Sequence, residues 1–222
     1  MIPDTLSLAS AWTAGTALAS AGLGWGQVGG SGIRGLLVFV TAVGLAAMGL
    51  TGAALPAAIG AVGLVVVLVA IRRPRVGAMG WLITGIAALP EAIDPGWLMG
   101  TGTVVLLGSI TAGLCLGHWF LVDPHLPRRP MRLLAGGALL GLAVTALATY
   151  LGPTSPPAIG DIAYTIAVVS GIITAVVLAL IFWSLAVPTY KGVQSATGLF
   201  YVSTMSVSAF VIVTSALRAA AV

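Results

Sequence analysis

Charged residues and cysteine are both scarce in this sequence, and their scarcity excludes several protein classes. Only 6% of the 222 residues are charged and 59% are hydrophobic, whereas a soluble globular domain carries about 25% charged residues. The chain therefore lacks the polar residues needed to cover a water-facing surface. Cys115 is the only cysteine, which excludes an intramolecular disulfide, a CxxC redox pair and a cysteine-rich zinc or iron–sulfur site.

Clustered positive charge and known catalytic motifs are also missing. The nine basic residues are spread over short segments, so they cannot form the patch that nucleic-acid binding requires. No HExxH or carboxylate-rich motif is present, and we expect no metal site. His118 and His125 are the only histidines. Because they lie at the same membrane edge, a bis-histidine haem in mid-membrane is excluded, and we expect no covalent cofactor.

What the sequence does contain is a series of long apolar segments. Crossing a hydrocarbon core of about 30 Å takes roughly 20 apolar residues as a helix. The pattern predicts an all-α fold, a polytopic membrane helix bundle that forms one integral membrane domain over residues 1–222. The eight predicted transmembrane helices cover residues 6–25, 35–50, 54–71, 77–93, 97–122, 133–151, 162–187 and 195–217.

The second and third of these helices belong to one uncharged run between Arg34 and Arg72. A single helix of that length would extend about 55 Å, nearly twice the thickness of the membrane core. Thr51, Gly52 and Pro56 supply residues that favour a turn in its middle. The run is therefore predicted to fold as a hairpin of two helices.

The loop charges predict the orientation of the chain. With eight helices, the loops after the first, third, fifth and seventh share one side, and they hold eight of the nine basic residues. Short basic loops stay in the cytoplasm, so both termini are predicted to be non-cytoplasmic. Four of the five acidic residues fall on the opposite side: Asp4, Glu91, Asp94 and Asp161.

The cytoplasmic end of the fifth helix holds the first candidate for a functional site. Thr111, Cys115 and His118 are spaced so that they share one helix face. An ionisable group at the end of a membrane helix is a candidate ligand-binding residue. The alternative is an interfacial histidine that bonds to the last helix carbonyls beside a membrane-interface tryptophan, Trp119.

A polar stripe on the eighth helix is the second candidate. It recurs at steps of three and four residues, through Gln194, Thr197, Tyr201, Thr204 and Ser208. The alternative is that the hydroxyls bond to carbonyls of their own helix or to neighbouring helices. The stripe begins at the same membrane depth as His118. We therefore predict a quinone-binding or lipid-binding site formed by His118, Trp119, Tyr190, Gln194 and Tyr201.

Three further features have a predicted role: an acidic residue near the membrane, an aspartate at the start of a helix and a pair of glycines. Glu91 is the acidic residue closest to the membrane on the non-cytoplasmic side, so it is a candidate proton or cation ligand, with a solvated carboxylate as the alternative. Asp161 follows Gly160 and is expected to cap the start of the seventh helix. Gly113 and Gly117 form a GxxxG step, which favours packing inside the bundle over a dimer interface.

These observations favour a membrane subunit of a larger respiratory or electron-transfer complex, not catalytic on its own, in a bacterial or archaeal plasma membrane. Its expected partners are membrane lipids, a quinone and other protein subunits. The helix count and outward termini resemble those of quinol-oxidising anchor subunits of some respiratory oxidoreductases, a likeness of topology without a matched motif. The alternative is a carrier or channel for a small neutral substrate, lined by Ser and Thr side chains, and a membrane enzyme with His118 as base ranks third.

Overall fold

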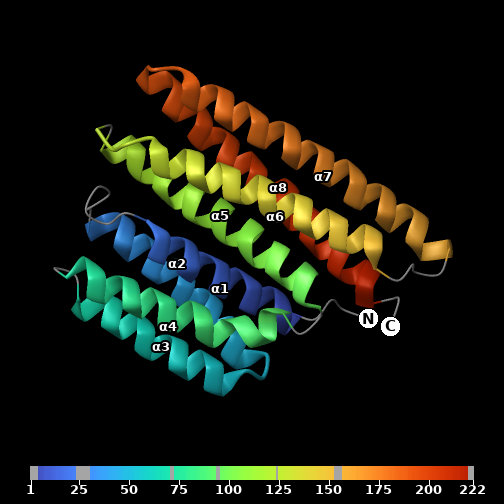
Figure 1. Cartoon of the computed structure of the whole chain (residues 1–222), viewed down its shortest axis with the longest axis horizontal. Helices are drawn as coiled ribbons and strands as arrows, with labels where there is room; N and C mark the ends of the chain where they lie inside the picture. Colours follow the sequence, from blue (N-terminus) through green and yellow to red (C-terminus); the bar gives the residue numbers. More distant parts are fainter. Residues whose placement is uncertain are drawn as a thin grey trace.

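The computed structural model describes residues 5–23, 31–70, 73–93, 96–123, 125–152 and 157–219, and every regular element in them is an α-helix. Figure 1 shows the helices side by side, running up and down along one axis. Their bounds are α1 Thr5–Gly22, α2 Ser31–Leu50, α3 Ala54–Val69, α4 Pro74–Ile93, α5 Trp97–Val122, α6 Arg129–Leu151, α7 Pro157–Ala186 and α8 Tyr190–Ala219. The predicted all-α class and the count of eight helices are confirmed for the described residues.

Six of these helices are long and apolar enough to cross a membrane by length and composition: α2, α4, α5, α6, α7 and α8. α3 is equally apolar but shorter, with 16 residues. α1 is packed inside the bundle, with half of its residues buried, and it buries hydroxyl side chains at Ser10, Thr13, Thr16 and Ser20. An interior helix need not be apolar all round, because neighbouring helices rather than lipid cover its polar groups.

The predicted hairpin within the uncharged run is confirmed. α2 ends at Leu50 and α3 begins at Ala54. Gly52 between them has φ +116°, a conformation that favours glycine because it has no Cβ. The Ala53 N–H donates to Met48 O at 3.0 Å and closes the turn.

Several helices begin earlier than their apolar segments. α6 starts at Arg129 rather than 133, and α8 starts at Tyr190 rather than 195. Hydropathy marks only the apolar part of a helix, whereas the polar first turns of α6 and α8 are helical too. The prediction that Asp161 caps the start of α7 is wrong. α7 already begins at Pro157, so Asp161 lies within the helix.

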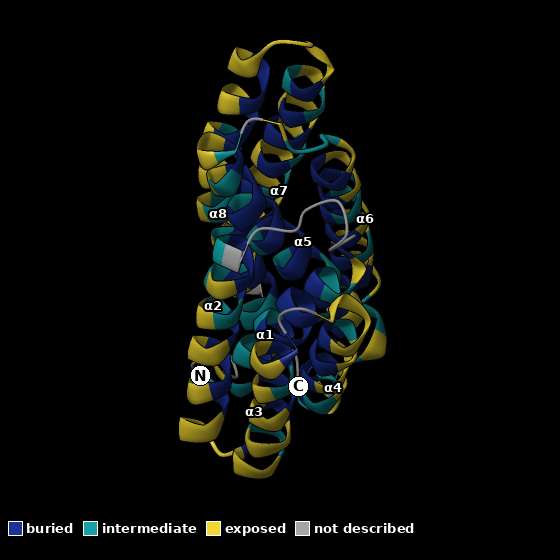
Figure 2. Cartoon of the chain, turned by 90° about the vertical axis from the view of Figure 1, so that its left-hand side faces the viewer, coloured by how far each residue is buried: buried dark blue, intermediate teal, exposed yellow. Residues whose placement is uncertain are grey.

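The bundle consists of two four-helix units with the same packing order. In α1–α4 and again in α5–α8, the first helix of the unit packs on the second and on the fourth. The third helix also packs on the second and on the fourth. The units meet mainly where α1 packs on α5. Figure 1 shows α1–α4 on one side of this junction and α5–α8 on the other, and Figure 2 shows buried residues concentrated on the helix faces that meet.

The charges separate between the two ends of the bundle. We call one end the basic end. Asp123 is the one acidic side chain described there, and the other charged side chains described there are all basic: Arg34, Arg73, Arg75, Arg128, Arg129, Arg132 and Lys191. At the other end, the described charged residues are Glu91, Asp161 and Arg218. Because the number of helices is even, α1 starts and α8 finishes at this opposite end (Figure 1).

Candidate ligand site at the basic end

His118 of α5 and Tyr201 of α8 form a hydrogen-bonded pair near the basic end. The Tyr201 Oη lies 3.3 Å from His118 Nδ1. Both side chains are exposed on the lateral surface of the bundle, and 49% of Tyr201 is accessible. The two residues were predicted to lie at one membrane depth, and the structure brings them into contact.

Two glycines of α5 let α5 and α8 approach closely enough for the two side chains to meet. A Cβ added to Gly113 would lie 2.4 Å from the Phe200 ring, and one added to Gly117 would lie 2.9 Å from Thr197 Oγ1. These glycines therefore let α5 and α8 pack closely, which confirms their predicted role inside the bundle. Side chains lean toward the N-terminus of their own helix, so in this antiparallel pair His118 and Tyr201 lean toward each other.

The hydroxyls of the polar stripe on α8 bond to carbonyls of their own helix or of α5, which is the second of the two interpretations given for them above. Thr197 is buried and donates to its own helix at Val193 O, 2.9 Å away, and toward Gly117 O of α5 at 3.1 Å. Thr204 and Ser208 each donate to the carbonyl four residues earlier, at 2.9 and 2.8 Å. These groups stabilise the helix and its contact with α5, and they are not available as donors to a ligand.

Gln194 and Tyr190 lie nearer the start of α8 and are exposed. Gln194 lies seven residues, about two helical turns, before Tyr201, so it shares the Tyr201 side of α8. Tyr190 is the first residue of the helix, farther out at the basic end. The structure thus places both residues nearer the basic end than the His118–Tyr201 pair. Among the described residues, no hydrogen bond joins Gln194 or Tyr190 to this pair.

Trp119 points away from this pair, toward α2. A Cβ on Gly32 would lie 2.1 Å from the Trp119 ring, so the indole packs directly on the first turn of α2. Its Nε1 is buried and finds no acceptor among the residues that the structure describes. Trp119 therefore joins α5 to α2 instead of lining the surface beside His118.

The structure also shows a partner that sequence reasoning missed. Thr111, on the His118 face of α5, accepts a hydrogen bond from Trp12 Nε1 of α1 at 3.0 Å. Cys115 on the same face is buried. The inner part of this face therefore packs against the rest of the bundle, and only its outer end at His118 stays accessible. Nothing in the sequence pairs Trp12 with Thr111, because they are distant along the chain.

Glu91 lies in the last turn of α4, one residue after Pro90, and is half-buried at the opposite end. It is thus part of the helix predicted over residues 77–93. Within the described residues, no group of three His, Cys, Asp or Glu side chains is close enough to hold a metal ion. The role of Glu91 as a proton or cation ligand stays a prediction.

No family model, curated protein or solved structure matches this chain. Near the basic end, an imidazole and a phenol are held together by a hydrogen bond on the exposed side of the bundle. When Tyr201 donates to Nδ1, the neutral imidazole carries its proton on Nε2, and this N–H belongs to an exposed side chain.

Proposed function

We propose that the chain crosses the membrane eight times, with the basic end in the cytoplasm and both termini outside. Short basic loops remain cytoplasmic, and seven described basic residues gather at this end. The outward-facing side chains of α3 are large and apolar, including Leu55 at 71% exposed and Val69 at 83%. Such a surface requires lipid. α3 is about 24 Å long, and local thinning of the bilayer accommodates a short span.

Aromatic residues support the same placement. Trp and Tyr favour the two membrane–water interfaces. Trp97 and Trp119 lie near the two ends of α5 and are separated by about 33 Å along the helix. On α7, the exposed Tyr164 and Trp183 are separated by about 29 Å. Both values fit a hydrocarbon core of about 30 Å.

Within that frame, we propose that the protein is the membrane subunit of a respiratory or electron-transfer complex and binds a quinone headgroup beside His118 and Tyr201. The observation that carries this proposal is the 3.3 Å contact between Tyr201 Oη and His118 Nδ1. A quinone carbonyl needs a hydrogen-bond donor, and its ring and tail need an apolar surface that opens to lipid. The exposed pair offers the imidazole N–H at the depth of the cytoplasmic interface.

The assignment as a subunit follows from what the residues can hold. The sequence has two histidines and one cysteine, and Cys115 is buried in α5. Iron–sulfur clusters need several cysteine ligands. Electrons for a quinone bound here would therefore come from redox centres of a partner protein.

Quinone binding can be tested with the purified protein and decylubiquinone as the probe, by titration of tryptophan fluorescence. We expect saturable binding in the native chain and binding about five- to tenfold weaker in Tyr201→Phe and His118→Gln, because each loses one hydrogen bond. The matched control is Met205→Leu, one turn along α8 and 78% exposed. Equal affinity in all four proteins would rule out a site at this pair.

Membership of a complex is tested separately, by gentle purification of the chain from its native membrane. We expect stoichiometric co-elution of other subunits, at least one with a redox cofactor. A clean monomer or homodimer would contradict the assignment as a subunit, whatever the quinone titration shows.

A carrier for a small neutral substrate is the second candidate, favoured by the matching packing order of α1–α4 and α5–α8. Structural repeats related by an axis along the membrane normal occur in transporters. Substrate flux in proteoliposomes, lost when the two units are cross-linked, would support it over the first candidate.

A further inference from the structure

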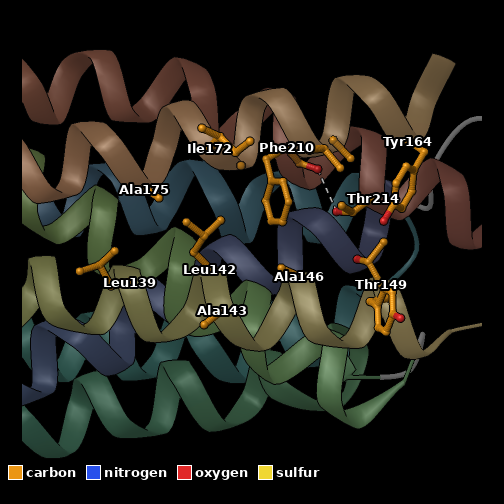
Figure 3. Close-up of a pocket in the computed structure, with 14 residues that line it drawn as sticks. Leu139, Leu142, Ala143, Ala146, Thr149, Tyr164, Ile172, Ala175, Phe210 and Thr214 are labelled. Atoms are coloured by element: carbon orange, nitrogen blue, oxygen red, sulfur yellow. Dashed lines mark hydrogen bonds between the residues drawn. The ribbon is translucent and has the colours of Figure 1, made fainter. Parts of the chain in front are cut away.

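An elongated groove opens on the side of the second unit, between α6 and α7. Its volume is about 510 Å³, within the usual range of small-ligand sites. Figure 3 shows Leu142 and Ala146 of α6 on one side, Ile172 of α7 on the other, and Phe210 of α8 between them. Ile172 is 59% exposed, so the groove opens laterally from the bundle.

The sequence creates this groove through small residues and helix divergence. α6 and α7 are in much looser contact with each other than α6 with α5 or α7 with α8. Ala143 and Ala146 leave space on the α6 side. Phe210 packs against Gly171, where an added Cβ would lie 3.3 Å from the ring, and this contact forms the floor.

The length of the groove matches one leaflet of a bilayer. Its lining on α6 runs from Leu139 to Tyr150, about 17 Å along the helix, and half of a hydrocarbon core is about 15 Å. The groove is therefore long enough for the part of an acyl chain that lies within one leaflet.

The groove ends beside a cation. Thr149 and Thr214 line both the groove and a small recess that also contains Arg218. Arg218 is the only basic residue described at this end of the bundle, and its Nη1 lies 3.7 Å from Met99 Sδ. Among the residues that the structure describes, no carboxylate forms an ion pair with it.

Of the other polar groups at this mouth, the two threonine hydroxyls are already used as donors, whereas the two phenols are exposed. The Thr149 hydroxyl donates to Thr145 O at 2.9 Å, and the Thr214 hydroxyl donates to Phe210 O at 2.8 Å, the bond drawn in Figure 3. The phenols of Tyr150 and Tyr164 are exposed at the same end. A guanidinium with two phenols is a donor set suited to phosphate oxygens.

We propose that this groove binds one acyl chain of an anionic phospholipid from the leaflet opposite the basic end, with the lipid phosphate at Arg218. This site lies at the other end of the bundle from His118 and does not depend on quinone binding. The chain is held by burial of methylene groups against the apolar lining, and the charge of Arg218 selects the headgroup.

The test uses the full chain in detergent micelles, with phosphatidylglycerol as the probe and phosphatidylcholine of the same acyl chains as the neutral comparison. Bound lipid is counted by native mass spectrometry. We expect about tenfold tighter binding of phosphatidylglycerol, a preference that is lost in Arg218→Gln and retained in Arg218→Lys.

Two neighbouring positions on α6 separate binding in the groove from general lipid contact. Ala146→Trp fills the groove, and we expect it to abolish retention of both lipids. Leu147→Trp places the same side chain on a half-exposed position outside the lining and should leave retention unchanged. Retention that survives Ala146→Trp, or equal binding of the two lipids by the native chain, would overturn the proposal. Photo-cross-linking of a partner protein from position 146 would overturn it as well.

Discussion

Gly15 of α1 and Gly108 of α5 pack backbone against backbone where the two four-helix units meet. A Cβ added to Gly15 would lie 2.1 Å from Val104 O, and one added to Gly108 would lie 2.2 Å from Gly15 O. Contacts this close are possible only without side chains, and they let main-chain atoms of two helices pack directly. The relative position of the units therefore depends on this pair.

Replacing Gly108 by alanine is expected to destabilise the protein by about 1–3 kcal/mol, because the added methyl has no room and must separate the helices. The measurement is thermal unfolding in detergent, followed with a thiol-reactive dye. Cys115, buried in the native bundle, becomes reactive when the protein unfolds.

Gly198→Ala on α8 is the matched control, since a Cβ there would meet nothing within 4 Å. Alanine at an open helical position is expected to stabilise by about 0.4–1 kcal/mol. A similar shift of both variants in the same direction would show that α1 and α5 are not in close contact at Gly108.

Arg128 caps the C-terminal end of α7 from the start of α6. Its Nη1 donates to Val187 O, and its Nη2 donates to Thr189 O at 3.0 Å. Lysine has a single ammonium and cannot reproduce this fork, so Arg128→Lys should cost about 0.5–1 kcal/mol.

The effect should be local, with faster hydrogen exchange over the turn between α7 and α8. The control is Arg129→Lys, the next residue, which is exposed. Exchange in that turn that is unchanged by Arg128→Lys would contradict the capping contact.

Thr84 joins α4 to α3 by a hydrogen bond inside the first unit. Its hydroxyl donates to Gly60 O at 2.9 Å, and it is fully buried. Thr84→Val keeps the shape but removes the donor, with an expected loss of about 0.6–2 kcal/mol. Thr84→Ser, which retains the hydroxyl, should recover much of that loss in the same unfolding measurement.

The proposed topology predicts which positions react with a membrane-impermeant maleimide. In a Cys115→Ala background, Arg73→Cys and Arg129→Cys should be labelled only from the cytoplasmic side. Asp161→Cys, exposed at the opposite end, should be labelled only from outside. Labelling of positions 73 and 129 from different sides would refute eight crossings.

Much of the fold follows from local sequence properties. α5 was predicted at 97–122 and is found there, because Gly96 and Pro124 border a long apolar run. The separation of basic and acidic residues follows from the same runs, since an alternating chain places every second loop at one end. Charged first turns, as at Arg129, escaped the hydropathy pattern although their backbone is helical.

The candidate site was predicted only in part. His118 and Tyr201 were expected at one depth, and they do meet. Trp119, the neighbour of His118 in sequence, was assigned to the same site but packs on Gly32 instead. Periodicity fixes which residues share a helix face, but it does not say which neighbouring helix that face meets.

The sequence by itself therefore determined the helices and the polarity of the bundle's two ends, because hydropathy and loop charge act on each segment locally. Only the tertiary structure decided the helix partners, the junction at Gly15 and Gly108, and the groove that ends at Arg218. The physical reason is that glycine is abundant here, with 30 residues, so close approach is permitted at many positions. Which approach occurs depends on the fit of all eight helices together.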